Sequence, residues 1–450
     1  MTIDPEILVK RSREYGLEEL EMYTLSSRTL QLEISNNKIS EMVTSINKVI
    51  AIRGSIGKRV GSIVLNDSAL NPETALSKLA KITKANPEDE NWPGFPSEKG
   101  PVTNTLCYDK EIGDIDESII PGYLHGFINR AIDVAMKNGA ERAKVVEGAW
   151  TLGVSELMII NSNGLHRTTK CSSNTFNMTV SVETTSGEAD KSMWLANRRL
   201  DIDEIEQLIE EETSRATLFI GAKPVESGKY DILFTPETAG MLISTLLIPA
   251  ISALNILENR SPLKDKINKE VFSTDVNIVD DPSLPFEIGS RGFDDEGIGT
   301  RNKTIIDKGV FKQPLHSYYT ARKANADPTG NGFRSSPGSQ PIPYITNMIL
   351  RERGGGLDDF ARDVKKGIVI YEMIGYWMSN PVNGIVKATV THGLLIENGE
   401  VVRPVKGVVI TGNIYDWLTL NLAAIGGDLV IKAGVGSPTL WIRDVDIGGE

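Results

Sequence analysis

Alternation of apolar and polar residues is the feature that most limits how this chain can fold. Residues 30–34 and 176–182 both follow this pattern. A period of two is typical of a strand that buries one face and exposes the other. Beyond residue 256, short apolar runs broken by glycine and proline indicate many more strands, among them a hairpin with an Asn398-Gly399 turn. The sequence therefore predicts an α+β protein with much antiparallel sheet.

Two changes in composition divide the 450 residues into three predicted domains. Residues 86–105 are rich in Pro, Gly, Asn and Glu, which is typical of a linker, and Gly221-Ala222-Lys223-Pro224 marks a second boundary. We predict an N-terminal α+β domain over residues 1–105, a central α+β domain over 106–222 and a large strand-rich C-terminal domain over 223–450. The length of the chain agrees with two or three domains.

The longest apolar run covers residues 241–256 and is interrupted by Pro249 and by polar residues. It falls short of the roughly 20 residues that a membrane span needs. We therefore predict a buried helix over residues 237–255. The formal net charge of -12 argues against broad nucleic-acid binding, because an acidic surface repels phosphate.

The cysteines and the N-terminus bear on the compartment. Cys107 and Cys171 are too few and too far apart to form a disulfide framework, so we expect two reduced thiols. The first ten residues carry Asp4 and Glu6 and no apolar stretch of a signal peptide. These features predict a cytoplasmic protein.

Spacing alone identifies no catalytic site. The chain has no Gly-x-Ser-x-Gly and no His-Glu-x-x-His segment. A zinc site needs ligands that lie close together, and the histidines are isolated in the sequence, so each is interpreted as a surface or packing residue. The histidines are His125, His166, His316 and His392.

The acidic run Asp294-Asp295-Glu296 admits two interpretations. One is a site for a cation or an amine. The other is a turn or the start of a helix, which is favoured because the run lacks the spaced acidic pattern of a calcium loop.

A set of short motifs resembles the TldD/PmbA family, once called modulators of DNA gyrase. Their order and spacing cover nearly the whole chain. The motifs are Ile160-Asn161-Ser162-Asn163-Gly164, Phe293-Asp294-Asp295-Glu296-Gly297, Thr300-Arg301, Thr320-Ala321-Arg322-Lys323, Pro328-Thr329-Gly330-Asn331, Pro404-Val405-Lys406-Gly407 and Ile410-Thr411-Gly412-Asn413.

The resemblance implies a zinc peptidase fold in which TldD-like chains carry His-Glu-x-x-x-His on a helix, whereas TldE (PmbA-like) chains lack it. Here Ser244 and Pro249 occupy the ligand positions, and Thr245 occupies the position of the general base. Proline has no side-chain donor atom, a serine hydroxyl is a poor zinc ligand, and threonine does not accept a proton near neutral pH as a carboxylate does. The chain is thus similar to the TldE-like members. We expect it to have no catalytic, cofactor-binding or metal-binding residues of its own.

The resemblance also implies partners. A TldD-like subunit would supply zinc and chemistry, and this chain would close the chamber in which unfolded peptides or small proteins are cleaved. A homodimer is a further expectation, because the family interface is pseudo-symmetric. No nucleic acid or membrane is expected. Two roles are possible for a set of motif residues, which would either line the chamber or brace the fold, and bracing is favoured. These residues are Asp294, Asp295, Glu296, Arg322 and Lys323.

Two alternatives stay open. The chain would be an independent peptidase if an unrecognised site formed from His316, His392, Cys171 and the acidic run at Asp294. It would be a non-enzymatic regulator if it bound a partner such as DNA gyrase, for which the sequence offers no specific feature.

Overall fold

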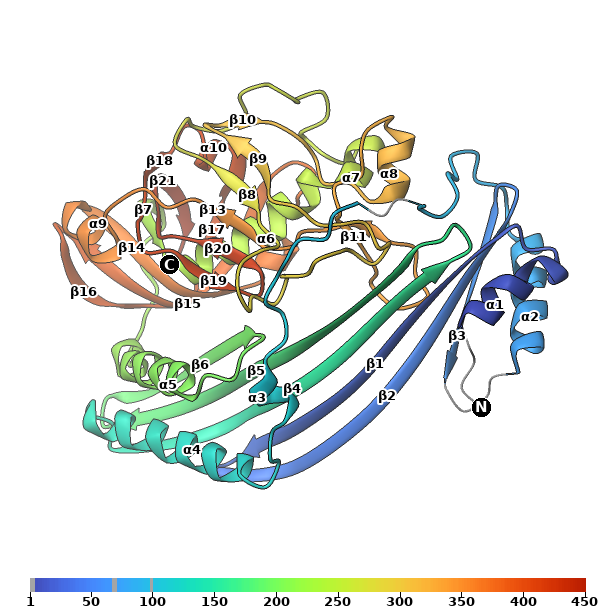
Figure 1. Ribbon diagram of the computed structural model, residues 1–450. Helices are drawn as coiled ribbons and strands as arrows, with labels where there is room; N and C mark the ends of the chain where they lie inside the picture. The colour runs from blue at the N-terminus through green and yellow to red at the C-terminus, as the bar shows by residue number, and fades with distance from the viewer. Residues whose placement is uncertain (1–4, 67–70, 98–99) are drawn as a thin grey trace.

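The computed structural model describes residues 5–66, 71–97 and 100–450. Its first layer is a six-stranded antiparallel sheet in the order β3-β2-β1-β4-β5-β6. The long strands β1, β2, β4 and β5 curve together across the molecule (Figure 1). The strands are β1 Glu19–Ser35, β2 Lys38–Ile56, β3 Arg59–Asn66, β4 Arg142–Asn161, β5 His166–Thr184 and β6 Gly187–Asn197.

This sheet joins strands from both sides of the predicted boundary at residue 105. β1 and β2 are connected by Asn36 and Asn37, whose φ angles of 48° and 65° suit a tight hairpin turn. β1 then pairs along its other edge with β4, from Glu21 opposite Asn161 to Ser35 opposite Glu147. The three-domain division stays a prediction, but the first two predicted units share one sheet.

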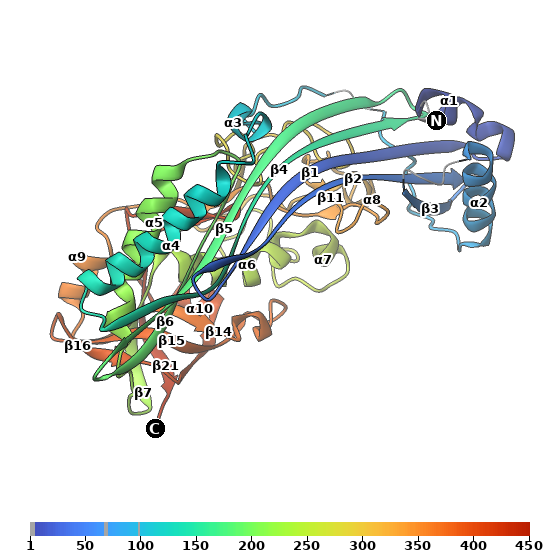
Figure 2. The same cartoon turned by 90° about the horizontal axis from the view of Figure 1, so that it is seen from below.

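Helices cover the two ends of this sheet, as the view from below makes clear (Figure 2). At one end, α1 and α2 pack on the sheet through a core that includes Leu8, Leu76 and Leu79. At the other end, α4 and α5 cover a core around Phe127 and Trp150. The helices are α1 Pro5–Arg11, α2 Pro72–Ala85, α3 Lys110–Gly113, α4 Ile120–Lys137 and α5 Ile202–Ala216, and 3-10 turns cover Ser12–Tyr15 and Thr217–Phe219.

The C-terminal part contains two large sheets around one buried helix, α6 (Pro236–Ile251), and a small sheet of β11 and β12. The larger sheet has the order β14-β7-β21-β17-β15-β16, with β18 paired to β21 and an added pairing of β14 with β15. Its strands are β7 Gly228–Phe234, β14 Lys366–Ile374, β15 Ile385–Glu397, β16 Glu400–Val405, β17 Val408–Asn413, β18 Leu422–Ile425 and β21 Leu440–Gly448.

The other large sheet of this part has the order β10-β9-β8-β13-β20-β19. Leu242, Ile243 and Leu246 of α6 belong to one core with residues of both sheets. The remaining elements are α7 Ala253–Leu257, β8 Ile278–Asp280, β9 Lys303–Asp307, β10 Val310–Phe311, α8 Tyr318–Lys323, β11 Gly332–Phe333, β12 Ile342–Pro343, β13 Met348–Leu350, α9 Leu357–Asp363, η4 Tyr376–Met378, α10 Ile414–Trp417, β19 Val430–Lys432 and β20 Val435–Ser437.

The mixed architecture with a strand-rich C-terminal part confirms the predicted α+β class. The long apolar helix is also present, although it ends earlier than predicted. α6 stops at Ile251, and Ser252 has the extended angles φ −69° and ψ 120° before α7 begins. Within the described residues, none of the helices combines the length and the apolar character that a membrane crossing requires.

The prediction of two reduced cysteines is wrong for this structure. Cys107 and Cys171 form a disulfide, with their Cα atoms 4.8 Å apart. The segment before α3 runs beside β5, where the N–H of Ser172 donates to the carbonyl of Cys107 over 2.8 Å. Sequence separation suggested that the two thiols were unrelated, but the pairing of these two segments brings them together.

Candidate functional site

The helix α6 carries the three positions that correspond to the zinc motif. The hydroxyl of Ser244 donates to the carbonyl of Met241 over 2.9 Å, and the hydroxyl of Thr245 donates to the same carbonyl over 2.8 Å. Pro249 lies inside the last turns of the helix. Both hydroxyls are therefore engaged by the backbone of their own helix.

These three residues do not fit a zinc ion. Proline offers no donor atom, and two hydroxyls bonded to a carbonyl lack the imidazole or thiolate character that zinc favours. Among the residues that the structure describes, no group of three or more His, Cys, Asp or Glu side chains is arranged to hold a metal. We therefore derive no metal chemistry from α6.

A cleft of about 940 Å³ opens beside the first turn of α6, where Glu237 and Met241 contribute to its lining. A second lobe of about 390 Å³ adjoins it. Trp194 from β6 and Lys432 from β19 line both lobes. The cleft thus lies where α6 faces the end of the N-terminal sheet.

A buried ion cluster borders this cleft. The ammonium of Lys191 on β6 pairs with Glu212 of α5 over 2.9 Å and with Glu372 of β14. Nδ1 of His392 lies 2.9 Å from the other oxygen of Glu372. Burial opposes ionisation of Glu372, but the bond from His392 and the charge of Lys191 outweigh it and lower its pKa. Sequence reasoning missed Lys191, because no spacing links the elements that meet here.

The acidic run at Asp294 is almost fully buried and bonded within the chain. The Asp294 carboxylate accepts from the N–H groups of Glu296, Ile298 and Gly332 over 2.8–3.0 Å. These bonds fix the turn that follows β8 and tie it to β11.

The other two acids of the run reach across to different segments. Asp295 accepts from the guanidinium of Arg291 and from the N–H of Arg334, each over 2.9 Å. Glu296 accepts from the N–H of Tyr318 at the start of α8 over 2.6 Å. All three carboxylates therefore connect loops of the C-terminal part.

Burial acts against ionisation of both Glu296 and Asp294. Burial raises the pKa of Glu296 well above its ordinary value, and the nearby Asp294 adds to the effect. Burial also raises the pKa of Asp294, to about 7, although three backbone donors oppose this. Glu296 accepts from one backbone donor, so its ionised form is less stabilised by hydrogen bonds than that of Asp294.

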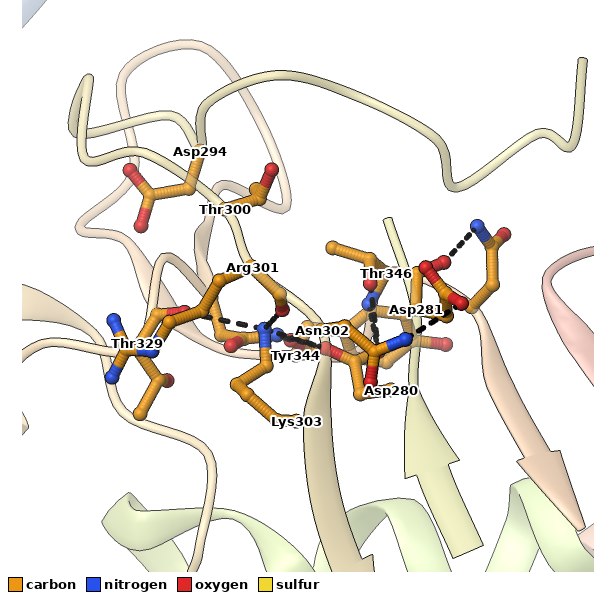
Figure 3. A network of polar contacts seen from close by, with 12 residues as sticks. Asp280, Asp281, Asp294, Thr300, Arg301, Asn302, Lys303, Thr329, Tyr344 and Thr346 are labelled. Atoms are coloured by element: carbon orange, nitrogen blue, oxygen red, sulfur yellow. Dashed lines mark hydrogen bonds and ion pairs between the residues drawn. The ribbon is translucent and has the colours of Figure 1, made fainter. Parts of the chain in front are cut away.

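A second buried network joins other motif segments (Figure 3). Nζ of Lys303 lies 3.1 Å from Oδ2 of Asp280, and it donates to the carbonyls of Arg301 and Thr329. Thr346 donates to Oδ1 of Asp280 through its N–H and its hydroxyl, over 2.7 and 2.8 Å. The motif residues at Arg301 and Thr329 thus have a bracing function within the fold.

Arg322 and Lys323 lie at the exposed end of α8. Each is placed over a ring of its own helix, Arg322 at 4.9 Å from the Tyr318 centroid and Lys323 at 5.8 Å from that of Tyr319. The helix begins with a capping box between Ser317 and Thr320.

The residues named for an independent site are each engaged elsewhere. Burial lowers the pKa of His316 to about 4, and its Nδ1 lies 3.3 Å from the Thr320 hydroxyl. Nε2 of His392 donates to the carbonyl of Asp190 over 2.8 Å. Cys171 is part of the disulfide.

Comparison with known proteins agrees with this geometry. The model of the PmbA/TldA metallopeptidase C-terminal domain matches residues 227–449, which contain α6, the acidic run and the Lys303 network. Residues 227–449 belong to the PmbA/TldA domain family. The PmbA/TldD domain thus includes both buried networks.

Two archaeal relatives match different lengths of the chain. A metalloprotease of Methanothermobacter thermautotrophicus is 30% identical over 262 residues, which is 56% of this chain and 57% of the relative. The chain thus spans little more than half the length of that relative. An uncharacterized protein of Methanocaldococcus jannaschii is 27% identical over 416 residues, covering 92% of this chain and 93% of the relative.

Solved structures show the same fold. The crystal structure of TldE from Thermococcus kodakarensis superposes with a TM-score of 0.88 and covers 99% of both chains. Its sequence identity is 24%, so the likeness establishes the PmbA/TldD fold and no more.

Proposed function

We propose that this chain is the non-catalytic, TldE-like subunit of a two-chain metallopeptidase whose zinc and general base belong to a TldD-like partner. The observation that supports this most is the chemistry of α6, where Ser244, Thr245 and Pro249 stand at the motif positions. Proline offers no ligand atom, and the neutral hydroxyls of Ser244 and Thr245, which donate to the Met241 carbonyl, are poor zinc ligands beside imidazole.

What the chain contributes in this proposal is shape and binding surface. The buried networks around Asp280 and Asp294 hold the loops of the C-terminal part in place. The cleft beside α6 then forms one wall of the chamber that receives unfolded peptides or small proteins. The proposal keeps the cytoplasm as the site of action. The Cys107–Cys171 disulfide argues against this location, because disulfides are rare in most cytosolic proteins.

The test is reconstitution with a TldD-like chain of the same organism that carries His-Glu-x-x-x-His. Each chain alone and the equimolar mixture are assayed on a fluorogenic unfolded peptide, with and without a chelator. We expect the mixture to elute as a heterodimer and to cleave the peptide until the chelator is added. This chain alone should be inactive.

Matched variants separate the two subunits. Alanine at either motif histidine of the partner should abolish cleavage. The double variant S244A/T245A of this chain should retain it, because both hydroxyls donate to the backbone of their own helix. Cleavage by this chain alone at the rate of the mixture, or loss of activity in S244A/T245A, would contradict the proposal.

A further inference from the structure

Two edge strands from different sheets line the cleft beside α6. β6 is the end strand of the N-terminal sheet, and β19 is the end strand of the smaller C-terminal sheet. Residues of both strands contribute to the two lobes. An edge strand carries a row of backbone donors and acceptors without a ladder partner, and such a row is a template for an added strand.

The outward groups of β6 can be assigned from its ends. The carbonyl of Asp190 accepts from His392, and the N–H of Arg198 donates to the carbonyl of Phe286, so both point away from β5. The β5–β6 ladder has no register shift between them. Because antiparallel pairing alternates, Ser192, Trp194 and Ala196 also turn their backbone groups outward, toward the cleft. The Ser192 carbonyl already accepts from Nζ of Lys191 over 3.2 Å, so an added strand would pair with the Ser192 N–H and with both backbone groups of Trp194 and Ala196.

Every cationic side chain of the lining is already paired with a carboxylate of the same lining. These pairs are Lys191 with Glu212 and Glu372, Arg199 with Glu204, Arg215 with Glu211 and Glu212, Arg362 with Asp359, and Lys432 with Glu237.

Three lining acids, in contrast, form no ion pair with any residue that the structure describes. They are Glu287 in the smaller lobe and Asp358 and Asp428 in the larger. Burial, with the charge of Glu204 adding to it, raises the pKa of Glu287 to about 7. A cation placed beside Glu287 would favour its ionised form. The cleft therefore has an excess of negative charge.

Beside these acids, part of the lining is aromatic and apolar. Tyr371, Ile374, Tyr376 and Trp377 follow one another from β14 into η4, and Trp377 is 63% exposed. The chain also places a cation of its own in the cleft. Nζ of Lys432 lies 5.3 Å from the Trp194 ring centroid and 3.4 Å from Glu237. A ring and a carboxylate around an ammonium are the elements of a lysine or arginine recognition site.

We propose that this cleft binds a cationic peptide segment, which adds to the edge of β6 as an extended strand. Its lysine or arginine side chains face Glu287, Asp358 and Asp428, and its alternate apolar side chains lie on the wall around Trp377. This inference deepens the proposed function, on which it rests for the origin of the peptide, by naming the class of peptide selected. A strand alternates its side chains between two faces, so one face can present cations to the acids while the other contacts the aromatic residues.

The probe is a fluorescein-labelled peptide that alternates lysine with phenylalanine or valine over seven residues. Its binding to the isolated full-length chain is measured by fluorescence anisotropy. A peptide with glutamate at every lysine position should bind at least about tenfold more weakly, because charge complementarity is reversed. Equal binding of the two peptides, or no binding of the lysine peptide, would overturn the proposal.

Backbone methylation tests the strand itself. Two variants of the lysine peptide carry N-methyl groups on alternate amides, one on each of the two alternating sets. Only the set that faces β6 donates to it, so one variant should bind about tenfold more weakly and the other should match the parent. If both match the parent and spermine displaces the peptide fully, the cleft holds small cations and the proposal fails.

Removal of the resident cation gives the sharpest test. Lys432→Met frees the Trp194 ring and leaves Glu237 unpaired, so the lysine peptide should bind about fivefold more tightly. Lys229→Met is the matched control, because Lys229 pairs with Asp446 outside the cleft and is exposed. A loss of affinity in Lys432→Met, with an unchanged melting curve, would contradict the assigned role.

These measurements are independent of the reconstitution assay. They use one chain, no partner and no cleavage. If the mixture cleaves peptide but the isolated chain shows no charge preference, only the cleft assignment fails. If the chain binds the lysine peptide as described but the mixture does not cleave, only the proposed function fails.

Discussion

The buried pair of Asp280 and Lys303 makes the most exact stability prediction. Their side chains are 0% and 1% exposed, and Nζ lies 3.1 Å from Oδ2. At an effective dielectric constant of about 20, that separation corresponds to an attraction of about 5 kcal/mol. Burial nevertheless lowers the pKa of Lys303, so desolvation offsets part of this gain.

Asp280→Asn keeps the side-chain volume and changes the charge. Its amide oxygen still accepts from Thr346, but its NH₂ group faces two donors, the Lys303 ammonium and the Asn331 amide. Removing one partner of a buried pair leaves the other charge unpaired, which costs about 3–5 kcal/mol. We therefore expect the free energy of unfolding of the C-terminal part to fall by about 4 kcal/mol, measured by urea titration with tryptophan fluorescence.

The chain offers a control with the same distance but different burial. Arg362 and Asp359 are also 3.1 Å apart, with side chains 71% and 62% exposed. Asp359→Asn should cost less than about 1 kcal/mol, because water screens an exposed pair. The double variant D280N/K303M should recover much of the loss, since no unpaired charge remains buried. Equal costs for the two single variants, or a double variant at least as unstable as D280N, would refute the reasoning.

Three more predictions concern other parts of the molecule. Burial raises the pKa of Glu296 above its ordinary value of 4.5, so the contribution of this group to stability is complete below pH 4.5 and is lost as the pH rises through the folded-state pKa. Glu296→Gln should therefore flatten the decline in the urea midpoint between pH 5 and 8.5. An unchanged slope would count against a protonated Glu296. Cys107→Ser removes a crosslink between residues 64 apart in sequence and should lower the free energy of unfolding by about 4 kcal/mol. If protein purified without reductant shows two thiols that react with dithionitrobenzoate, the cysteines are reduced and this prediction fails. Asn71→Ala removes the side-chain cap on the Glu73 N–H at the start of α2, and a thermal melt should show a loss of about 1 kcal/mol, with no effect meaning that water replaces the cap.

Local chemistry determined much of this fold from the sequence alone. The period-two pattern identified β1 and β5, because an antiparallel strand with one buried face must alternate. The Asn398-Gly399 turn was predictable because β15 and β16 need positive φ at both residues, and their φ angles are 52° and 84°. The zinc-motif positions were also readable, since whether proline or serine can bind a metal is a property of the residue itself.

Contacts between distant segments could not be predicted in the same way. Periodicity identifies a strand but not its neighbour, so the pairing of β1 with β4 across the predicted boundary appears only in the fold. The disulfide depends on the segment before α3 running beside β5, which no spacing of Cys107 and Cys171 encodes. Whether the acids near Asp294 were exposed or buried was likewise open, because burial is set by every element around a residue.

The cleft shows the same division most clearly. The sequence determined which side chains are acidic, aromatic or cationic. It also predicted the strand pattern at residues 176–182 before Gly221 and the helix over residues 237–255 after it. Only the tertiary structure decided that β6 and β19 are edge strands and that they face the first turn of α6. An edge is a property of the whole sheet, since it exists only where no other segment pairs, and no single segment contains that information.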